Sequence, residues 1–244
     1  MKRIAISQSN YIPWKGYFDL IKTVDEFVLY DEVQFTKNDW RNRNRINTTT
    51  GPKWMTIPVA TSAQFGQRIL DARVVDQRWR KHHWHSWQSH YGSAAHFTDY
   101  RDQLAALYLS STETQLSQIN FAFIQAICRW LDIRTPIIWS QDYAHEAADP
   151  SVRLLQICQA AGATHYLSGP AARDYLRVEL FHRSGIVVEW MNYNDYPSYR
   201  QLPGTFVHAV SAMDLILNEG PRAPAFLKPK GECISPAAIT PHDL

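Results

Sequence analysis

The pattern of hydrophobic and polar positions near the amino terminus predicts a strand, a helix and a second strand. Residues 3–7 alternate and are apolar enough for a strand, whereas residues 15–24 place apolar side chains on one side of a helix. Residues 27–30 form a short apolar run that is typical of a buried strand. These elements make one βαβ unit, in which ligands bind at the carboxyl ends of the strands.

The middle of the chain predicts a β-hairpin followed by helices. Residues 44–47 and 54–59 alternate, and Thr-Thr-Gly-Pro at 49–52 marks the turn between them. Residues 67–75 are expected to form a short strand, after which Asp76 caps a helix over 77–91. The most regular helical period in the chain covers residues 112–131.

Strands and helices alternate again in the second half. The predicted elements are a strand at 137–139, a helix from Asp149 to Gly162, a strand at 164–168, a helix from Gly169 to about Leu180, a strand at 186–190 and a helix at 212–218 that Ser211 caps and Gly220 ends. This order predicts an α/β domain with a Rossmann-like, largely parallel sheet.

The domain organisation follows from the same pattern. Residues 1–220 are predicted to form a single domain, and the hairpin and helices at about 40–131 form an insertion that covers the strand ends. Residues 221–244 contain Pro, Gly and Lys with little periodicity, which predicts a flexible tail.

The amino-acid composition says more about the cellular location of the protein than about its function. The 244 residues carry 25 Lys and Arg against 23 Asp and Glu, and this balance argues against a nucleic-acid-binding protein. Cys128, Cys158 and Cys233 are far apart and form no CxxC, so we expect reduced thiols and a cytoplasmic protein. The first residues lack the apolar run of a signal peptide, and no apolar run of about 18 residues predicts a membrane span.

Large polar and aromatic side chains gather where the first two strands end. These residues are Gln8, Asn10, Tyr11, Trp14, Tyr17, Asp31 and Gln34. Aromatic residues make up 13% of the chain, and their faces suit flat or sugar-like ligands. The alternative is that each of these rings fills or caps the core.

Two further segments could bind an anion. Residues 40–45 read Trp-Arg-Asn-Arg-Asn-Arg, and Arg41, Asn42 and Arg43 could hold a carboxylate or phosphate, although such runs are often solvated surface. Ser168 and Gly169 precede a predicted helix whose free N–H groups could bind the same anion, with Arg173 one turn further on. The alternative for this second segment is a tight turn without a ligand.

Four histidines crowd the helix predicted at 77–91, namely His82, His83, His85 and His90. Their spacing includes no HExxH and no accompanying carboxylate, so we predict no metal site. His83 is the candidate for a single functional histidine, while its spacing from Trp87 and Tyr91 also fits ordinary helix packing.

Several of these segments resemble the WbqC-like family of bacterial proteins. The matching stretches include SNYIPWKGYFDLI at 9–21, DEVQFTKNDWRNRNRI at 31–46, HWHSWQSHY at 83–91 and THYLSGPAARDYL at 164–176, and the resemblance covers roughly residues 2–220. Members are typically encoded beside genes for O-antigen or other surface polysaccharides, or beside natural-product genes. The resemblance implies modification of amino sugars by transfer of an acyl or aminoacyl group.

The opening βαβ unit is also similar, more distantly, to nucleotidylyltransferases of the HxGH type. Residues 168–173 are similar to the later phosphate-binding turn of those enzymes. At the positions of their two histidines this chain has Trp14 and Tyr17, and only Gly16 is retained. The resemblance therefore favours the fold and a nucleotide or anion pocket, but it argues against adenylyl transfer.

From these features we predict a transferase that acts on a nucleotide-linked amino sugar in surface-polysaccharide biosynthesis. Asp31 or His83 would be the base, and Gln8, Asn10 or Gln34 would stabilise an oxyanion. The acyl or aminoacyl donor would be CoA or a carrier-protein thioester, which makes an acyl carrier protein a candidate partner, and no cofactor is assigned. The alternatives are a non-catalytic nucleotide-sugar binder and a nucleotidylyltransferase with an altered site. All of them require four segments to meet at one cleft. These are the 8–17 loop, Asp31, the arginine arm formed by Arg41 and Arg43, and the 168–173 turn.

Overall fold

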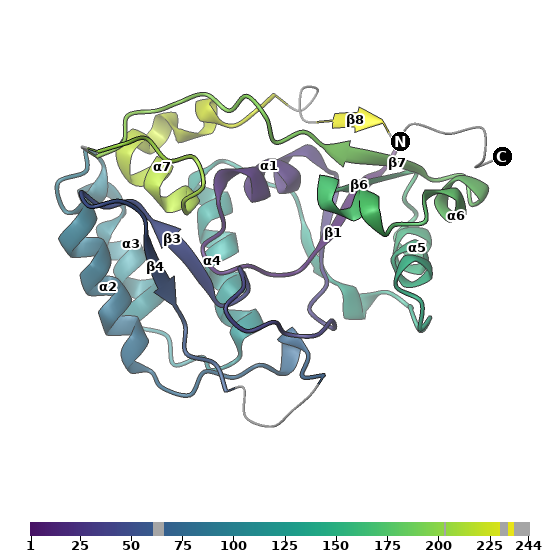
Figure 1. Ribbon diagram of the computed structural model, residues 1–244, viewed down its shortest axis with the longest axis horizontal. Helices are drawn as coiled ribbons and strands as arrows, with labels where there is room; N and C mark the ends of the chain where they lie inside the picture. Colours follow the sequence, from purple (N-terminus) through teal and green to yellow (C-terminus); the bar gives the residue numbers. More distant parts are fainter. Residues whose placement is uncertain (61–65, 203, 230–233, 237–244) are drawn as a thin grey trace.

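The computed structural model describes residues 1–60, 66–202, 204–229 and 234–236, which form helices on both faces of a central sheet (Figure 1). Six strands make up this sheet, in the order β5-β2-β1-β6-β7-β8. Their bounds are β1 Arg3–Ser7, β2 Glu26–Leu29, β5 Ile137–Trp139, β6 His165–Ser168, β7 Val187–Met191 and β8 Ile234–Pro236. The first five are parallel to one another, while β8 pairs antiparallel with β7. The predicted α/β fold with a largely parallel sheet is confirmed.

The strand order determines where a ligand site can form. From β1 the chain adds β2 and then β5 on one side, and it later crosses over to add β6 and β7 on the other side. Adjacent strands β1 and β6 therefore continue into loops that diverge to opposite sides, which opens a crevice at their carboxyl ends. The polar loop after Ser7 and the turn after Ser168 both lie at this point.

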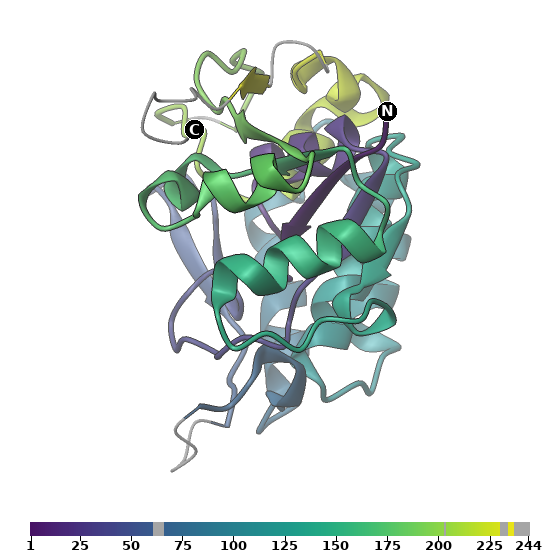
Figure 2. The ribbon, with the colours of Figure 1, turned by 90° about the vertical axis from the view of Figure 1, so that its right-hand side faces the viewer.

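Alternating side chains divide the core into two layers. Ala5, Phe27 and Leu29 point to the face covered by α1 (Lys15–Thr23), α4 (Leu116–Trp130) and α7 (Ala212–Glu219). Ile4, Ile6 and Val28 point to the opposite face. Figure 2 shows this second face covered by α5 (Pro150–Ala160) and α6 (Val178–Arg183), which lie side by side. Burial on both faces explains why these strands are apolar at nearly every position.

The predicted insertion packs against the first layer and shares its hydrophobic core. Strands β3 (Arg43–Ile46) and β4 (Lys53–Thr56) pair antiparallel, as the predicted hairpin requires. Helices α2 (Arg78–Tyr91) and α3 (Phe97–Leu109) follow, and Figure 1 places this unit at the end of the molecule opposite α5 and α6. Helix α3 was not predicted, because it buries only Phe97, Leu104 and Tyr108 and so has little apolar periodicity.

Two predicted elements are wrong. Residues 67–75 form no strand, because they make isolated bridges to three different segments around the 3₁₀ turn η1 (Ile69–Asp71). The helix predicted from Gly169 to Leu180 is instead a 3₁₀ turn, η3 (Pro170–Asp174), followed by the separate helix α6. At Arg177 the backbone has ψ of 85°, which is incompatible with a continuous helix. Helix α4 also begins four residues later than predicted, at Leu116.

The caps agree better with the sequence. Asp149 accepts a hydrogen bond from the N–H of Val152 at the start of α5, and Ser211 accepts one from Met213 at the start of α7. Asp76 accepts a hydrogen bond from the N–H of Arg78, the first residue of α2. Gly220 ends α7 with φ of +54°, a backbone conformation that favours glycine.

The carboxyl-terminal residues that the structure describes are packed rather than extended. After η4 (Gly220–Phe226), Leu227 and Lys228 are buried, and the Lys228 N–H donates to the carboxylate of Asp19. Strand β8 then pairs with β7. The predicted flexible tail at 221–244 thus contains ordered elements, while residues 230–233 and 237–244 lie outside the described part. The division at residue 220 stays a prediction.

Cys128 and Cys158 are free and buried, whereas Cys233 lies outside the described residues. Burial raises the pKa of the Cys128 thiol to about 12, so this sulfur is a packing group rather than a nucleophile. Within the described ranges, no helix has the length and apolar character needed to cross a membrane.

Candidate functional site

A cavity of about 550 Å³ opens at the carboxyl ends of β1, β2 and β6. Among the residues that the structure describes, its lining contains two arginines but no Asp, Glu, Lys or His. Its walls carry seven aromatic residues, namely Trp14, Tyr17, Tyr30, Trp40, Tyr166, Tyr175 and Tyr193. The volume lies within the range of about 300–1,000 Å³ that is usual for small-molecule sites. A cationic, aromatic-walled cavity of this kind suits a ligand that combines a ring with an anionic group.

Arg41 and the loop after β1 form one wall. The Arg41 guanidinium donates to Oδ1 of Asn10 and, over 3.1 Å, to Oε1 of Gln8. Because Arg41 can only donate, both amide oxygens must face it, which leaves the amide nitrogens of Gln8 and Asn10 as donors. Among the described residues neither nitrogen has an acceptor. The wall therefore presents a guanidinium and two amide N–H₂ groups, all of which favour an anion or a carbonyl oxygen.

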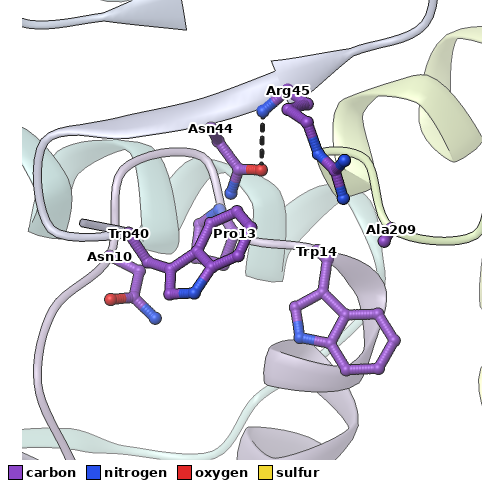
Figure 3. A pocket seen from close by; sticks show the side chains of 7 residues that line it. All are labelled: Asn10, Pro13, Trp14, Trp40, Asn44, Arg45 and Ala209. Carbon is purple, nitrogen blue, oxygen red and sulfur yellow. Dashed lines mark hydrogen bonds between the residues drawn. The ribbon is translucent and has the colours of Figure 1, made fainter. Parts of the chain in front are cut away.

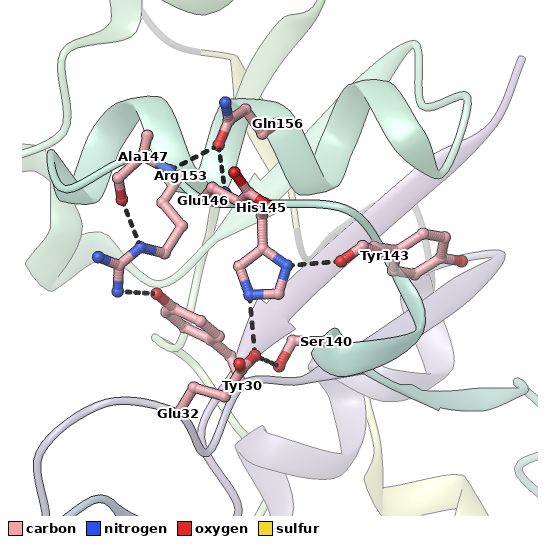
Figure 4. A network of polar contacts seen from close by, with 9 residues as sticks. All are labelled: Tyr30, Glu32, Ser140, Tyr143, His145, Glu146, Ala147, Arg153 and Gln156. Carbon is pink, nitrogen blue, oxygen red and sulfur yellow. Dashed lines mark hydrogen bonds and ion pairs between the residues drawn. The ribbon is translucent and has the colours of Figure 1, made fainter.

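The second arginine, Arg153, lies on the wall formed by the first turn of α5. Its Nε donates to the carbonyl of Ala147 over 2.7 Å, and its Nη1 donates to the Tyr30 hydroxyl over 3.0 Å (Figure 4). These contacts fix the guanidinium but do not neutralise its charge. Tyr30 is the first residue after β2, so Arg153 is held directly at a strand end.

A neighbouring polar cluster has the residue types of an acyl-transfer triad without its geometry. Ser140 Oγ donates to Oε2 of Glu32 over 2.6 Å, and His145 Nε2 lies 2.8 Å from the same oxygen (Figure 4). The serine thus contacts the carboxylate rather than the imidazole, so His145 is not placed to take the Ser140 proton. The cluster joins the ends of β2 and β5 and is not part of the cavity lining.

Half of the predicted site residues meet in the cavity. They are Gln8, Asn10, Trp14, Tyr17, Arg41, Ser168 and Gly169. Ser168 and Gly169 end β6 on the wall opposite the 8–17 loop, and the Tyr17 hydroxyl donates to the carbonyl of Gln8 over 2.9 Å. The predicted convergence of the first loop, the arginine arm and the glycine turn is therefore found for Arg41, Ser168 and Gly169.

Asp31 lies behind this wall rather than in it. Its Oδ1 accepts the Ser9 N–H over 2.7 Å, and its other oxygen accepts the Ser117 hydroxyl. Burial raises the pKa of the Asp31 carboxyl, and the hydrogen bonds from Ser117 and Ser9 oppose that rise. One oxygen fixes the loop after β1 and the other bonds to α4, and the buried carboxylate does not line the cavity in which the predicted base would have to act.

His83 is buried in the insertion, and Tyr11 of the loop after β1 is buried against it. The Tyr11 hydroxyl lies 2.8 Å from His83 Nδ1 and 2.6 Å from the hydroxyl of Tyr108. Burial lowers the pKa of His83 to about 3, so the imidazole is neutral at neutral pH. Neither residue lines the cavity, which means that the packing alternative describes His83 and that Tyr11 offers no ring face to a ligand.

The remaining predicted residues point elsewhere. Gln34 is exposed and forms an isolated bridge with Arg68, while Asn42 is buried and donates to the carbonyl of Ile57 over 2.9 Å. The guanidinium carbon of Arg43 lies 4.1 Å from the centre of the Trp54 ring, outside the cavity. The guanidinium carbon of Arg173 lies 5.5 Å from the centre of the Trp190 ring. Arg173 belongs to η3, which is too short to provide a helix N-terminus.

The separation of Arg41 from Arg43 has a backbone cause. Strand β3 begins at Arg43, and Arg41 belongs to the preceding turn, in which the Asn42 N–H donates to the carbonyl of Asp39 over 3.1 Å. The direction of the Arg41 side chain is set by this turn, while Arg43 follows the alternation of the strand. Two arginines that are two residues apart therefore do not share a ligand.

Sequence reasoning missed Arg153, Tyr30 and Trp40 as lining residues. A signal existed for Arg153, because the Asp149–Pro150 start places the first turn of α5 beside the strand ends. Tyr30 directly follows a strand predicted to be central, which is another detectable signal. No group of three or more His, Cys, Asp or Glu side chains in the described ranges could hold a metal ion.

A protein-family model and a sequence relative match this chain. The model of the WbqC-like protein family matches residues 8–226. The chain is 47% identical over 229 residues to an uncharacterized protein of Mycobacterium tuberculosis, Rv1507c, and the match covers 93% of this chain and 98% of that protein. No solved structure matches the chain. The family match covers the cavity-forming loops and the whole insertion, and the chain belongs to the WbqC-like protein family.

Proposed function

We propose that this protein binds a nucleotide-linked sugar in the cavity at the carboxyl ends of β1, β2 and β6. The observation that carries the proposal is the lining itself, in which two arginines are present and every carboxylate is absent among the described residues. A nucleotide diphosphate supplies an anion for Arg153, and for Arg41, whose Nη2 lies 3.9 Å from Oδ2 of Asp39 outside the lining. Its base and sugar supply rings for the aromatic walls.

The position of the cavity supports the same ligand class. Open parallel sheets bind nucleotides at the point where the strand order reverses, and here that point lies between β1 and β6. Arg41 is the central group of the proposal, because it reaches the cavity together with Gln8 and Asn10. Their amide nitrogens and the guanidinium form a donor set for phosphate oxygens.

For the reaction, we propose transfer of an acyl or aminoacyl group to an amine of the bound sugar, in cytoplasmic synthesis of a surface polysaccharide. The amide donors of Gln8 and Asn10 could stabilise the oxyanion that forms when the amine attacks a thioester of CoA or of an acyl carrier protein. The C–S bond then breaks as the amide forms, and the thiolate leaves as the free thiol with the proton that the amine loses. The amine itself would have to reach the cavity unprotonated, because Asp31 and His83 lie outside the lining.

The missing base also favours a second candidate, a non-catalytic nucleotide-sugar binder. Among the described lining residues no His, Lys, Asp or Glu is available to accept a proton. The two candidates share the ligand and differ only in turnover. Incubation with a nucleotide amino sugar and an acyl thioester, followed by mass spectrometry, separates them, since only the transferase yields an N-acylated sugar.

Binding can be tested before any reaction is known. Thermal unfolding would be followed with UDP-, dTDP-, GDP- and CMP-linked sugars and with ADP. Ligand at about 100 times its Kd stabilises the folded state by about 2.7 kcal/mol, which corresponds to roughly 5–11 °C in Tm for a chain of this size. If no nucleotide raises Tm, the proposed function is wrong.

Replacement of Arg41 locates the binding. We expect Arg41→Gln to raise Kd at least ten-fold, because the variant removes one of the two charges that the cavity offers an anion. The matched control is Arg101→Gln, on an exposed side chain of α3 whose recorded ion pair is with its neighbour Asp102. Equal affinity in wild type and the Arg41 variant would place the nucleotide elsewhere.

A further inference from the structure

A smaller slot of about 240 Å³ adjoins the main cavity (Figure 3). The two spaces share Asn10, Trp14 and Trp40 as lining residues, so one ligand can occupy both. The slot is smaller than the range of about 300–1,000 Å³ for whole drug-sized ligands, which suits a single ring. Pro13, Asn44, Arg45 and Ala209 complete its walls.

Both indoles of the slot contact other aromatic rings. A Cβ atom on Gly16 would lie 2.3 Å from Cζ2 of Trp14, so only glycine lets this ring lie close against the start of α1. Tyr193 and Tyr196 contact the Trp14 ring edge-on at centroid distances of 5.3 and 5.6 Å. On the other side, Trp40 packs on Trp54 at 5.5 Å. The Trp14 wall is therefore preorganised, which lowers the entropic cost of holding a ring against it, whereas Trp40 is 42% exposed.

Among the described lining residues of the slot, Arg45 is the charged one. Figure 3 shows its guanidinium extending toward the space between the two indoles, beside Ala209. No carboxylate in the described part of the chain forms an ion pair with it, and its Nε is buried there without a hydrogen-bond partner. The charge of this partly buried cation is uncompensated, which favours an anionic group on the ligand, although the buried Nε itself lies out of reach of the slot.

The other polar groups of the slot also favour an anionic ligand. Asn44 is already committed, since its Nδ2 donates to the carbonyls of Tyr11 and Ile12 and its Oδ1 accepts the Arg45 N–H. Asn10 retains its amide nitrogen, because its oxygen accepts from Arg41. The groups left for a ligand are thus donors, which match an anion and ring oxygens but not another cation.

We infer that this slot binds a pyranose ring that carries an anionic substituent, either a carboxylate or a phosphate. The ring stacks between Trp14 and Trp40, and Arg45 pairs with the substituent. The inference rests on the proposed function, since it identifies the sugar portion of the nucleotide-linked ligand whose diphosphate lies at Arg41. A neutral sugar would leave Arg45 uncompensated, as would a nucleobase.

The slot can be tested with free sugars, independently of the nucleotide. The full chain would be labelled with 5-fluorotryptophan, and the ¹⁹F resonances of the slot indoles assigned with Trp14→Phe and Trp40→Phe. Titrations would use methyl β-glucuronide, glucose 1-phosphate, the neutral methyl β-glucoside and uridine. We expect both resonances to shift, with Kd at least ten-fold lower for one anionic sugar than for the glucoside. The tighter anionic probe identifies the substituent.

Two variants test whether Arg45 causes the preference for an anionic sugar over a neutral one. Arg45→Gln should abolish the ten-fold preference, whereas Arg43→Gln, on the same strand but outside the slot, should retain it. The inference is wrong if the glucoside or uridine binds as tightly as the anionic sugars, if no probe shifts either resonance, or if Arg45→Gln keeps the preference. Nucleotides that raise Tm while no sugar enters the slot would overturn this inference alone. Sugar binding without nucleotide binding would overturn the proposed function alone.

Discussion

Two polar regions flank the loop after β1, and they use similar side chains for different purposes. On the cavity side, Arg41 is bonded to the amide oxygens of Gln8 and Asn10, which leaves their nitrogens as donors. On the insertion side, Tyr11 bonds to His83 and Tyr108. The Tyr108 hydroxyl also accepts from Trp87 Nε1 over 2.9 Å. The second region is closed upon itself, whereas the first has unused hydrogen-bonding capacity.

The contrast separates groups that stabilise the fold from groups that can bind. A buried polar group without a partner costs free energy, so a closed network contributes to stability and offers nothing to a ligand. Asn10 and Tyr11 are neighbours in sequence, yet one lines the cavity and the other is fully buried. We therefore expect variants on the insertion side to lose stability and variants on the cavity side to lose affinity.

The largest expected effect is on the insertion side at acid pH. Burial lowers the pKa of His83 to about 3, so below its usual value of about 6.5 the unfolded chain gains a proton that the folded chain excludes. The free energy of unfolding should therefore fall by up to about 5 kcal/mol between pH 6.5 and pH 3. Urea unfolding of wild type and His83→Gln across this range measures the effect as a difference. Parallel curves would mean that His83 is protonated in the native state.

Asp31→Ala should be the next most damaging change. It removes the acceptor of both the Ser9 N–H and the Ser117 hydroxyl, and two buried donors without partners cost about 2–5 kcal/mol. Urea unfolding at pH 7 measures the loss. The control is Asp71→Ala, which breaks an exposed pair with Arg68 and should cost less than about 1 kcal/mol. If the Asp31 variant were as stable as the control, the carboxylate would not be fixing the loop.

On the cavity side we expect the opposite outcome for Asn10→Ala. The free energy of unfolding should change by less than about 1 kcal/mol, because the side chain is only half-buried. The Kd for a nucleotide sugar should rise roughly ten-fold through loss of about 1.5 kcal/mol of hydrogen bonding. Calorimetric titration and urea unfolding of the same sample test both halves. Unchanged affinity would remove Asn10 from the site.

The smallest expected effect is that of Arg43→Ala on the Kd for a nucleotide sugar. Arg43 was predicted to share the anion with Arg41, but its guanidinium packs on Trp54 outside the cavity. Arg43→Ala should therefore change the Kd for a nucleotide sugar by less than about two-fold, or about 0.4 kcal/mol. A loss as large as that of Arg41→Gln would show that the arm moves when ligand binds.

The architecture could be read from the sequence because its signals are local. The β1–α1–β2 unit and the caps at Asp149 and Ser211 agree with the structure, since alternation, helical period and cap chemistry act over a few residues. The prediction of a strand at residues 67–75 was wrong for the converse reason. Its residues pair singly with Gln34, Val59 and Gln115, and no local pattern encodes three separate partners.

The candidate site could be predicted only in part. Gln8 and Asn10 were found because polar side chains follow a strand that periodicity places in the sheet, and Arg41 was found because it belongs to a run of alternating arginines and amides. Asp31 occupies the same kind of position, yet the loop backbone at Ser9 takes its carboxylate. Sequence position predicts nearness to a site, but it does not say whether a side chain is already used by the protein.

The strand order, and with it the switch point between β1 and β6, came only from the structure. By itself, the sequence determined the α/β fold with a largely parallel sheet and the family of the chain. These depend on short-range patterns and on segments that are read one at a time. Only the tertiary structure decided that Arg153 and Trp40 join the cavity while His83 and Arg43 leave it. That choice depends on which donors and acceptors meet across distant segments, because a side chain bonded within the protein is no longer available to a ligand.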